Sequence, residues 1–354
     1  MPLEKIAVLG LGKVGALAAK LLHRTGLEVV GFDHRTPRET QAFAVQAVDL
    51  ASEDGLRAAT RGFDAVLSCL PYRINQRIAG AAHAQGMHYF DLTEDVPTTR
   101  EIIELGKTSR GLMAPQCGLA PGFVGIVGAS QVAAFDQCRS LRLRVGALPQ
   151  NPTGLMGYAF NWSPEGVVNE YLNDCEVIEG GVRKMVSSME WLETLYVEGV
   201  MLEAFTTSGG LGTICETFHG KVANIDYKTM RYPGHMRLMN FFFHELLMRE
   251  RRELAGEILT NAKPPVSDDI VYVHVSAEGL LDAGLQRREF VRAYRPIELV
   301  GSMQTAIAWT TSASVVAVIE LVRDRLLPQR GFLKQEEIPL ASFLATATGR
   351  LFAA

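Results

Sequence analysis

Three glycines near the N-terminus have the spacing of a phosphate-binding loop. They occur in Gly10-Leu-Gly-Lys-Val-Gly15, which follows a short apolar run and precedes a helical pattern, the context that such a loop requires. Gly10 would allow a tight turn, Gly12 a close approach of a pyrophosphate, and Gly15 close packing of the helix on the strand. The anion would lie on the helix N-terminus; the alternative is a glycine turn without a ligand. The residues expected to bind the phosphates of a nicotinamide dinucleotide are Gly10, Gly12, Lys13, Val14 and Gly15.

Asp33 bears on which dinucleotide binds. It ends the second predicted strand, about 18 residues beyond Gly15, where a carboxylate usually bonds the ribose hydroxyls. Such a carboxylate repels a 2′-phosphate and favours NAD. Arg35 would bind that phosphate if Asp33 turned away, so NADP use stays open. We expect Asp33, His34 and Arg35 to contact the nucleotide, with NAD as the cofactor.

Two further segments follow predicted strands in the first third of the chain. Leu70-Pro-Tyr72 follows one strand, and Phe90-Asp-Leu-Thr-Glu-Asp95 follows the next. The carboxyl ends of parallel strands form the edge at which such sheets bind ligands. The acidic segment would suit a free ammonium group; helix capping by Thr93 or Asp95 is an equal alternative.

A third segment, Cys117-Gly-Leu-Ala-Pro-Gly122, precedes another predicted helix. Pro121 is expected in the first turn of that helix, whose N-terminus would face the nicotinamide. Cys117 itself fits a small buried apolar residue better than a nucleophile.

Arg231 and His235 are the strongest candidates in the second half of the chain. A guanidinium matches a carboxylate through two hydrogen bonds, and an imidazole carries protons near neutral pH. A surface ion pair is the alternative for Arg231. Phe160-Asn-Trp-Ser-Pro164 is an aromatic and polar turn suited to a pocket wall, and residues 206–210 form a glycine-rich turn that would approach a ligand or close a hairpin.

The elements that must position these residues change character along the chain. Strands separated by helices in the first third imply right-handed crossovers and a parallel sheet, whereas polar–apolar alternation from about Cys138 onwards indicates a sheet with one solvated face. Strands are expected at 5–9, 27–32, 64–69, 88–92, 139–145, 182–189 and 270–277, and helices at 14–25, 75–85, 241–259 and 303–327. The predicted fold is α/β: a Rossmann-type doubly wound parallel sheet, then a second α+β domain built on a largely antiparallel sheet.

Composition and charge exclude several classes of protein. The 354 residues include 35 Lys and Arg against 39 Asp and Glu, and the net charge of −4 excludes nucleic-acid binding through counterion release. Residues 299–319 carry no Asp, Glu, Lys or Arg, but their Ser and Thr content favours a buried or interface helix over a membrane span. That uncharged face is either core or a subunit contact, and we expect a homodimer or higher homo-oligomer.

Cysteines and histidines bear on compartment and metal binding. The five cysteines are scattered without a CxxC pair, which indicates a reducing, cytoplasmic location, and no signal peptide is expected before the first strand. His219, His244 and His274 lack the spacing of metal ligands. We therefore expect no metal ion.

Six segments, in this order along the chain, resemble the saccharopine dehydrogenase/reductase-like family, and within it most closely the lysine 6-dehydrogenases. They are specific to the family rather than to one member. The segments are Gly10–Gly15, Leu70–Tyr72, Tyr89–Leu92, Cys117–Gly122, Asn161–Gly166 and Arg231–His235. The resemblance implies a nucleotide-binding domain, 1–135, completed by a C-terminal helical segment, 303–354. It also implies an inserted sheet domain, 136–302, that closes over the substrate and supports dimerisation.

The resemblance also implies roles for individual residues. Tyr72, Asp91 and His235 would be catalytic, and Arg231 would hold the carboxylate of an amino acid. The other residues implied are Asn161, Trp162, Cys117 and Glu94 for the substrate, and Cys69, Leu70, Pro71 and Gly118 for the cofactor.

Members of this family carry out reversible hydride transfer at a carbon bearing an amine. We expect an NAD(P)-dependent oxidoreductase that oxidises the terminal amine of L-lysine to the 6-semialdehyde, because a free ammonium suits the acidic segment 90–95. The base for the amine proton would be His235 or Tyr72. Two alternatives stay open: an opine-forming reductase of the saccharopine or carboxynorspermidine type, and a non-catalytic dinucleotide-binding sensor.

Overall fold

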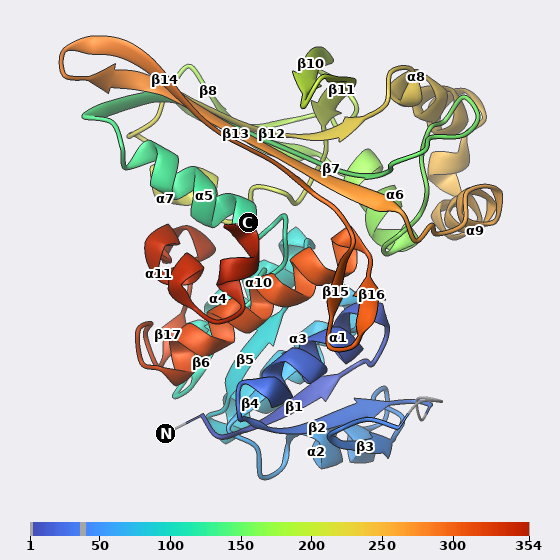
Figure 1. Cartoon of the computed structure of the whole chain (residues 1–354), viewed down its shortest axis with the longest axis vertical. Coiled ribbons are helices and arrows are strands. Elements are labelled where there is room, and N and C mark those ends of the chain that lie inside the picture. The colour runs from blue at the N-terminus through green and yellow to red at the C-terminus, as the bar shows by residue number, and fades with distance from the viewer. Residues whose placement is uncertain (1–2, 36–39, 354) are drawn as a thin grey trace. The chain divides into compact units, whose positions relative to one another are not determined.

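The computed structural model describes residues 3–35 and 40–353, which form two compact units (Figure 1). The first contains Met1–Ile126 and Ala308–Ala354, and the second contains Val127–Ile307. The division expected from the sequence, at 135/136 and 302/303, differs from these boundaries. Both boundaries lie inside helices, α5 (Phe123–Val132) and α10 (Ala306–Arg323), where helical periodicity continues across the change of packing partner.

The sheet of the first unit is parallel. Its strands follow the order β17-β6-β5-β4-β1-β2-β3, and each neighbouring pair is parallel. The chain leaves β1 towards β2 and β3 and then crosses to β4, which makes the carboxyl ends of β1 and β4 the switch point where such sheets bind ligands. The strands are β1 (Lys5–Leu9), β2 (Glu28–Asp33), β3 (Ala44–Ala47), β4 (Ala65–Ser68), β5 (His88–Asp91), β6 (Leu112–Ala114) and β17 (Gly331–Phe332). The predicted Rossmann-type doubly wound sheet is confirmed.

Helices pack on both faces of this sheet (Figure 1). Leu9, Phe32 and Tyr89 share one buried cluster with residues of α2, α3 and α4. On the other face, α1 and α10 lie side by side, because the Ser312 hydroxyl donates to the Val14 carbonyl at 2.9 Å. The helices are α1 (Lys13–Arg24), α2 (Glu53–Thr60), α3 (Tyr72–Gln85), α4 (Val96–Gly106), α10 and α11 (Leu340–Ala345).

Helix α10 has the length and apolar composition of a membrane span, but 83% of its residues are buried inside the protein. Such burial is typical of a helix in the core of a protein. Expected at 303–327, it begins only at Ala306, because Ser302–Gln304 forms strand β16 with β15 (Ile297–Leu299). The carboxylate of Asp269 accepts hydrogen bonds from the N–H groups of Ala306, at 2.6 Å, and Ile307, at 2.9 Å, and thereby caps the helix.

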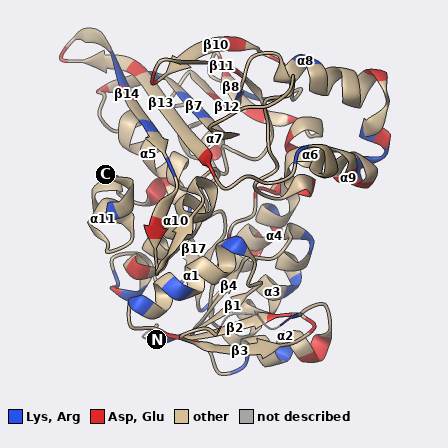
Figure 2. Cartoon of the chain, turned by 45° about the vertical axis from the view of Figure 1, so that its right-hand side comes forward, with Lys and Arg blue, Asp and Glu red and all other residues tan. Residues whose placement is uncertain are grey.

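The sheet of the second unit is mixed. Its main path is β10-β11-β12-β7-β13-β14, with β8 and β9 beside β12. Only β12 and β7 are parallel among its paired strands in the described residues, so the predicted largely antiparallel sheet is confirmed. The strands are β7 (Gln137–Pro149), β8 (Cys175–Glu179), β9 (Val182–Val186), β10 (Glu193–Val197), β11 (Val200–Thr206), β12 (Asn224–Arg231), β13 (Asp269–Leu281) and β14 (Gly284–Tyr294). Basic and acidic residues are interspersed along these elements (Figure 2).

Three local predictions were wrong. Residues 241–259 do not form one helix: α8 (His235–Asn240) continues into a π-helical turn, Phe241–Glu245, and α9 (Arg252–Ala262) follows after a break at Leu247, whose φ is +56°. Of the two alternatives for the turn 206–210, the hairpin is wrong, because β11 is followed by the short helix α7 (Ile214–Phe218); the approach to a ligand stays a prediction. Pro121 precedes α5 rather than lying in its first turn, after a cis peptide bond with Ala120.

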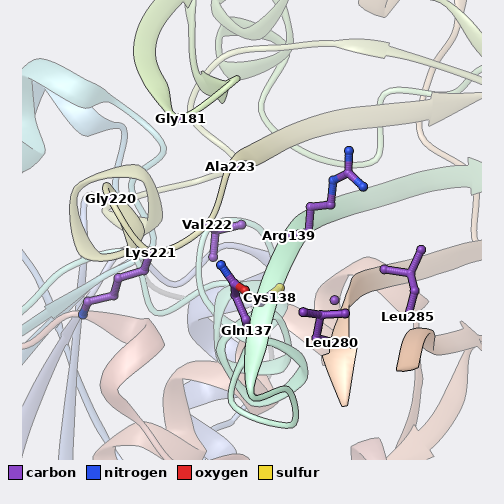
Figure 3. A pocket seen from close by; sticks show the side chains of 11 residues that line it. Gln137, Cys138, Arg139, Gly181, Gly220, Lys221, Val222, Ala223, Leu280 and Leu285 are labelled. Carbon is purple, nitrogen blue, oxygen red and sulfur yellow. The ribbon is translucent and has the colours of Figure 1, made fainter. Parts of the chain in front are cut away.

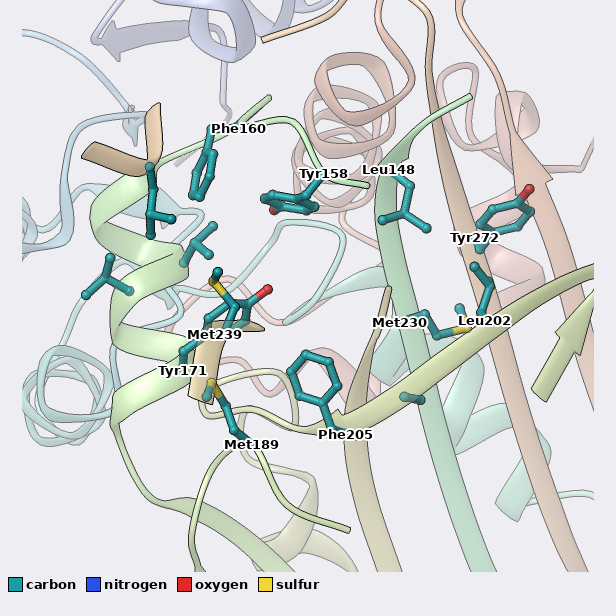
Figure 4. Close-up of a cluster of buried hydrophobic side chains, with 14 of the residues drawn as sticks. Leu148, Tyr158, Phe160, Tyr171, Met189, Leu202, Phe205, Met230, Met239 and Tyr272 are labelled. Atoms are coloured by element: carbon teal, nitrogen blue, oxygen red, sulfur yellow. The ribbon is translucent and has the colours of Figure 1, made fainter. Parts of the chain in front are cut away.

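The core of the second unit lies between helix α6 (Pro164–Leu172) and strands β7, β11 and β12 (Figure 4). It is rich in aromatic side chains, of which Tyr158, Tyr171 and Phe205 bear on the candidate site. Ser163 begins α6 by accepting a hydrogen bond from the Gly166 N–H at 3.1 Å. The apolar spacing of Val167, Val168 and Tyr171 then turns one face of α6 onto the sheet.

Candidate active site

The glycine loop has the geometry that a dinucleotide requires. Gly10 has a φ of +86°, and a Cβ added at Gly15 would lie 1.8 Å from the carbonyl oxygen of Gly10, so neither position accepts a side chain. Gly12 differs: its φ is −67°, and no atom lies within 4 Å of an added Cβ. That open space beside the backbone fits the expected approach of a dinucleotide pyrophosphate.

The start of α1 is suited to an anion. The helix begins after Gly12 without a side-chain cap, and its first turn contains no acidic residue. The N–H groups of Lys13 and Val14 therefore face the open space with the positive end of the helix dipole behind them. The residues at this loop fit NAD or NADP.

Asp33 is fixed at the end of β2. Its carboxylate accepts hydrogen bonds from the backbone N–H groups of Leu11, at 2.6 Å, and Arg35, at 3.2 Å. The His34 ring lies 2.7 Å from the same carboxylate. The bond to Leu11 ties Asp33 to the glycine loop itself; its expected contact with the ribose of a dinucleotide stays a prediction.

Asp91 is buried at the end of β5, where its carboxylate accepts four hydrogen bonds. They come from the Tyr89 hydroxyl at 2.7 Å, the Asn75 amide at 3.3 Å, and the backbone N–H groups of Thr93 at 3.0 Å and Gln116 at 2.9 Å. Burial raises the pKa of Asp91 to about 6, against the opposing effect of these bonds. Asp91 therefore anchors the segments that follow β5 and β6; its expected catalytic role stays a prediction.

Cys117 is buried in a neutral setting. Its thiol donates to the Ala114 carbonyl at 3.1 Å, and the Gln335 amide donates to the sulfur at 3.2 Å. Burial raises the pKa of Cys117 well above its ordinary value, and the nearby Asp91 adds to this effect. Burial likewise raises the pKa of Cys69 to about 12. Both thiols therefore stay protonated at neutral pH, which fits the apolar interpretation of Cys117.

The other predicted residues of this unit surround the loop ends. Asp95 caps α4 by accepting hydrogen bonds from the Thr98 N–H, at 2.9 Å, and hydroxyl, at 2.6 Å, so the capping alternative is confirmed for Asp95. Glu94 is half-buried before it. Tyr72, half-buried, begins α3 after the exposed Pro71. Leu70 lies against Gly10, and the Gly118 carbonyl accepts a hydrogen bond from the Ser314 hydroxyl at 2.8 Å.

In the second unit, Arg231 and His235 are linked through a residue that sequence analysis missed, Tyr171. The Arg231 Nε–H donates to the Tyr171 hydroxyl at 2.7 Å, and the same hydroxyl lies 3.0 Å from the Nε2 atom of His235. Tyr171 lies 60 residues before Arg231, and no motif marks it. The only feature that could have pointed to Tyr171 is its position on the buried face of α6.

His235 is a neutral imidazole in this arrangement. Its Nδ1 lies 3.0 Å from the Met156 carbonyl, which only accepts, so Nδ1 carries the proton and Nε2 accepts from the Tyr171 hydroxyl. Burial, followed by the nearby Arg231, lowers the pKa of His235 to about 3. A group with this pKa is a poor proton carrier near pH 7, the role expected from sequence, and serves better as a fixed hydrogen-bond acceptor.

Arg231 is 2% exposed and charged. Burial opposes the charge, but the neighbouring Tyr171 and Tyr158 keep the pKa of Arg231 above its ordinary value, and Glu170 acts on it at longer range. Its Nη1 donates to the Thr229 hydroxyl and to the Met230 carbonyl, and its guanidinium carbon lies 4.6 Å from the centre of the Tyr158 ring. Nη2 makes no hydrogen bond to the part of the chain that the structure describes.

Glu203, also missed by sequence analysis, fixes the turn between Arg231 and His235. It lies opposite Arg231 in the β11–β12 pair. Its carboxylate accepts hydrogen bonds from the N–H groups of Gly234, at 2.8 Å, and Met236, at 2.6 Å, which are at the start of α8. The position of His235 relative to Arg231 thus depends on Glu203.

Asn161 and Trp162 have different surroundings. The Asn161 amide oxygen accepts a hydrogen bond from the Val266 N–H at 2.7 Å, so this side chain fastens a neighbouring loop. Trp162 is half-buried and packs against the aromatic core beside Tyr158 and Phe160. The structure thus brings together Arg231, His235 and Trp162 in the second unit, and Asp91 and Cys117 in the first.

A separate pocket of about 490 Å³ lies at one end of the second unit's sheet (Figure 3). Arg139 and Lys221 line it, with their side chains directed away from each other, beside Cys138 and Val222. None of the predicted site residues contributes to it. Among residues 3–35 and 40–353, no three His, Cys, Asp or Glu side chains are grouped as metal ligands.

Two domains of a known protein family match this chain. Residues 6–112 match the saccharopine dehydrogenase NADP binding domain, and residues 118–351 match the saccharopine dehydrogenase C-terminal domain. The chain belongs to the saccharopine dehydrogenase family. Its first unit is therefore a nicotinamide-dinucleotide-binding domain, as the glycine loop predicts.

Individual relatives of this saccharopine dehydrogenase family member are distant. The NADP(+)-dependent, L-glutamate-forming saccharopine dehydrogenase of Schizosaccharomyces pombe is 23% identical over 205 residues, which cover 54% of this chain and 46% of that protein. The match thus spans less than half of that relative. The structure of the L-Glu-forming saccharopine dehydrogenase of Saccharomyces cerevisiae, 15% identical, has a TM-score of 0.70 over 94% of both chains. An engineered D-amino acid dehydrogenase bound to NADP+, 13% identical, has a TM-score of 0.53 over 99% of this chain and 98% of its own. These structures support the fold.

Proposed function

We propose that this chain is an NAD(P)-dependent oxidoreductase that transfers a hydride at an amine-bearing carbon of an amino acid. The observation that carries the proposal is the buried guanidinium of Arg231. Charged side chains are rarely buried without a partner, and Arg144, also buried, pairs with Glu193 and Asp226. Arg231 has no such ion pair within the described residues. Its natural partner is the carboxylate of a ligand.

The chain's own residues would divide the work as follows. Arg231 binds the substrate carboxylate, and Tyr171 holds the guanidinium by its Nε–H so that Nη2 is directed to the ligand. The nicotinamide, when bound, accepts the hydride. The amine must first lose a proton; of the two expected bases, His235 is a poor acceptor because its pKa is lowered to about 3, which leaves Tyr72. Asp91 would hold in place the segments that follow β5 and β6.

Two substrates fit this proposal. Oxidation of the terminal amine of L-lysine gives an imine, which water hydrolyses to the 6-semialdehyde and ammonia. A free ammonium group would have to bind the carboxylates of the acidic segment 90–95. However, Asp95 caps a helix, and Asp91 already accepts hydrogen bonds from surrounding donors. The structure therefore lends lysine less support than the sequence does.

The second substrate class is a secondary amine of the saccharopine type, whose oxidation and hydrolysis release an amino acid and an aldehyde. The names of the relatives from the two yeasts favour it. Such a substrate also carries carboxylates for Arg231. We propose it as the leading candidate, with lysine 6-dehydrogenase activity as the alternative.

The test measures reduced nicotinamide formed from L-saccharopine and from L-lysine, with NAD and NADP separately. Turnover of either substrate supports the proposal and identifies the branch. An Arg231→Lys variant should raise the KM for that substrate about 100-fold with a smaller change in kcat, because a Lys ammonium cannot keep the contacts to Tyr171, Thr229 and Met230 and donate to the ligand as well. Cofactor binding without turnover of either amino acid, in both directions, would instead favour the non-catalytic sensor.

A further inference from the structure

Beside Arg231 lies a hydroxyl whose own proton has no acceptor in the described part of the chain, that of Tyr158. Tyr158 is 2% exposed, and the Trp162 side chain donates to its hydroxyl, which donates to no described residue in turn. Nearly all buried polar groups in proteins are hydrogen-bonded, so each exception needs an explanation. Burial raises the pKa of Tyr158, so the hydroxyl keeps its proton at neutral pH.

The surroundings of Tyr158 place this hydroxyl at the candidate carboxylate site. Its ring lies under the guanidinium of Arg231, 4.6 Å from the ring centre to the guanidinium carbon. It packs edge-on against Phe160 at 5.0 Å (Figure 4). It also packs edge-on against His235 at 5.2 Å, and the two contacts fix its orientation. Trp162, half-buried at the border of this cluster, donates a side-chain hydrogen bond to the Tyr158 hydroxyl.

We infer that Tyr158 is a second donor to the ligand carboxylate and determines, with Arg231, the requirement for that group. Two donors on neighbouring side chains can occupy both oxygens of one carboxylate. This inference rests on the proposed function, since it assumes an amino-acid ligand. An amine without the carboxylate would leave both the buried guanidinium and the hydroxyl unpaired, so it binds poorly.

Tyr171 provides the matched comparison. Both tyrosines are buried beside Arg231, but the Tyr171 hydroxyl already contacts Arg231 and His235, at 2.7 and 3.0 Å. Removing a hydroxyl that both accepts and donates within the protein lowers stability more than removing one whose own proton has no acceptor there. The two Tyr→Phe variants therefore separate a ligand-binding hydroxyl from a structural one.

The experiment measures thermal unfolding of the free protein, and dissociation constants by calorimetry for L-saccharopine, L-lysine and 1,5-diaminopentane, which is lysine without its carboxylate. Tyr158→Phe should lower the Tm less than Tyr171→Phe does and weaken amino-acid binding at least ten-fold, with no effect on the diamine. Tyr171→Phe should lower the Tm. Tyr272→Phe, in the same core, should change neither amino-acid affinity nor diamine affinity.

Two results would overturn the inference. If Tyr158→Phe lowers the Tm as much as Tyr171→Phe does, the hydroxyl is structural. If Tyr158→Phe binds the amino acid as tightly as wild type while Arg231→Met does not, Arg231 alone holds the carboxylate, and the proposed function stands without Tyr158. Wild-type protein that binds neither L-saccharopine nor L-lysine would contradict the proposed function together with this inference.

Discussion

The carboxylate of Asp33 accepts a hydrogen bond from the backbone N–H of Leu11 at 2.6 Å, which ties the end of β2 to the glycine loop. This bond opposes the movement of Asp33 that a 2′-phosphate would require. We therefore expect NAD to be preferred, although the matching family domain is named for NADP. Asp33→Asn should raise kcat/KM for NADP relative to NAD at least ten-fold, because it removes the charge that repels the phosphate.

Steady-state kinetics with each cofactor at saturating amino acid measures this preference. The ratio of kcat/KM for NAD to that for NADP in the wild type tests the preference for NAD. The change of this ratio in Asp33→Asn tests the role of the carboxylate. Equal kcat/KM for NAD and NADP in the wild type would contradict the role given to Asp33.

Gly12 and Gly15 should respond differently to the same substitution. Gly12→Ala places its Cβ in open space at an allowed φ, so the Tm should not change, while cofactor affinity falls at least ten-fold because the methyl occupies the pyrophosphate position. Gly15→Ala places its Cβ 1.8 Å from the Gly10 carbonyl oxygen and should lower the Tm by several degrees. Thermal unfolding and cofactor titration distinguish the two; a Gly12→Ala variant with unchanged cofactor affinity would exclude the loop as the phosphate site.

Glu203 should contribute both to the stability of the protein and to its affinity for the amino acid. Glu203→Gln retains one acceptor but turns an N–H₂ group towards the N–H of Gly234 or Met236, which should lower the free energy of unfolding by about 1–3 kcal/mol. Because the turn carries His235, the KM for the amino acid should also rise. Glu198→Gln, which removes only an exposed ion pair with Arg295, is the control and should have little effect. Urea unfolding and kinetics of both variants test this.

Buried His88 should weaken the fold in acid. Its Nδ1 accepts the Leu112 N–H at 3.1 Å, and burial lowers the pKa of His88 to about 4 from its ordinary 6.5. The unfolded chain therefore binds a proton near pH 6.5 that the folded chain takes up only near pH 4. Stability from this group is present above pH 6.5 and is lost as the pH falls, by about 3 kcal/mol in total.

His88→Asn keeps an acceptor for Leu112 without the titration. Urea unfolding at pH 7 and pH 4.5 should show a smaller acid loss in the variant than in the wild type. Equal losses would mean that His88 does not titrate differently in the folded and unfolded chain. The lowered pKa of His235, about 3, acts in the same direction and accounts for part of the loss that remains.

The sequence alone predicted those features that depend on residues close to one another along the chain. The Gly10–Gly15 loop and the alternation of β1, β2, β4 and β5 with α1 and α3 follow from periodicity and from residues close in sequence. The short elements β3, α2, α4 and β6 were not predicted. Capping by Asp95 is equally local. The prediction of one long helix at 241–259 was wrong, because apolar periodicity gives no indication of a break such as the one at Leu247, where the backbone is left-handed.

Only the tertiary structure decided the chemistry of the second unit. Arg231 and His235 are visible as candidates, but the hydroxyl that joins them comes from Tyr171, 60 residues earlier, and the carboxylate that fixes their turn from Glu203, on the neighbouring strand. Burial, which no residue type encodes by itself, makes His235 neutral. Among the described residues it leaves the charge of Arg231 without an ion pair and the proton of the Tyr158 hydroxyl without an acceptor. A sequence determines which groups exist; the packing of distant segments determines their pKa values and which of their hydrogen bonds remain for a ligand.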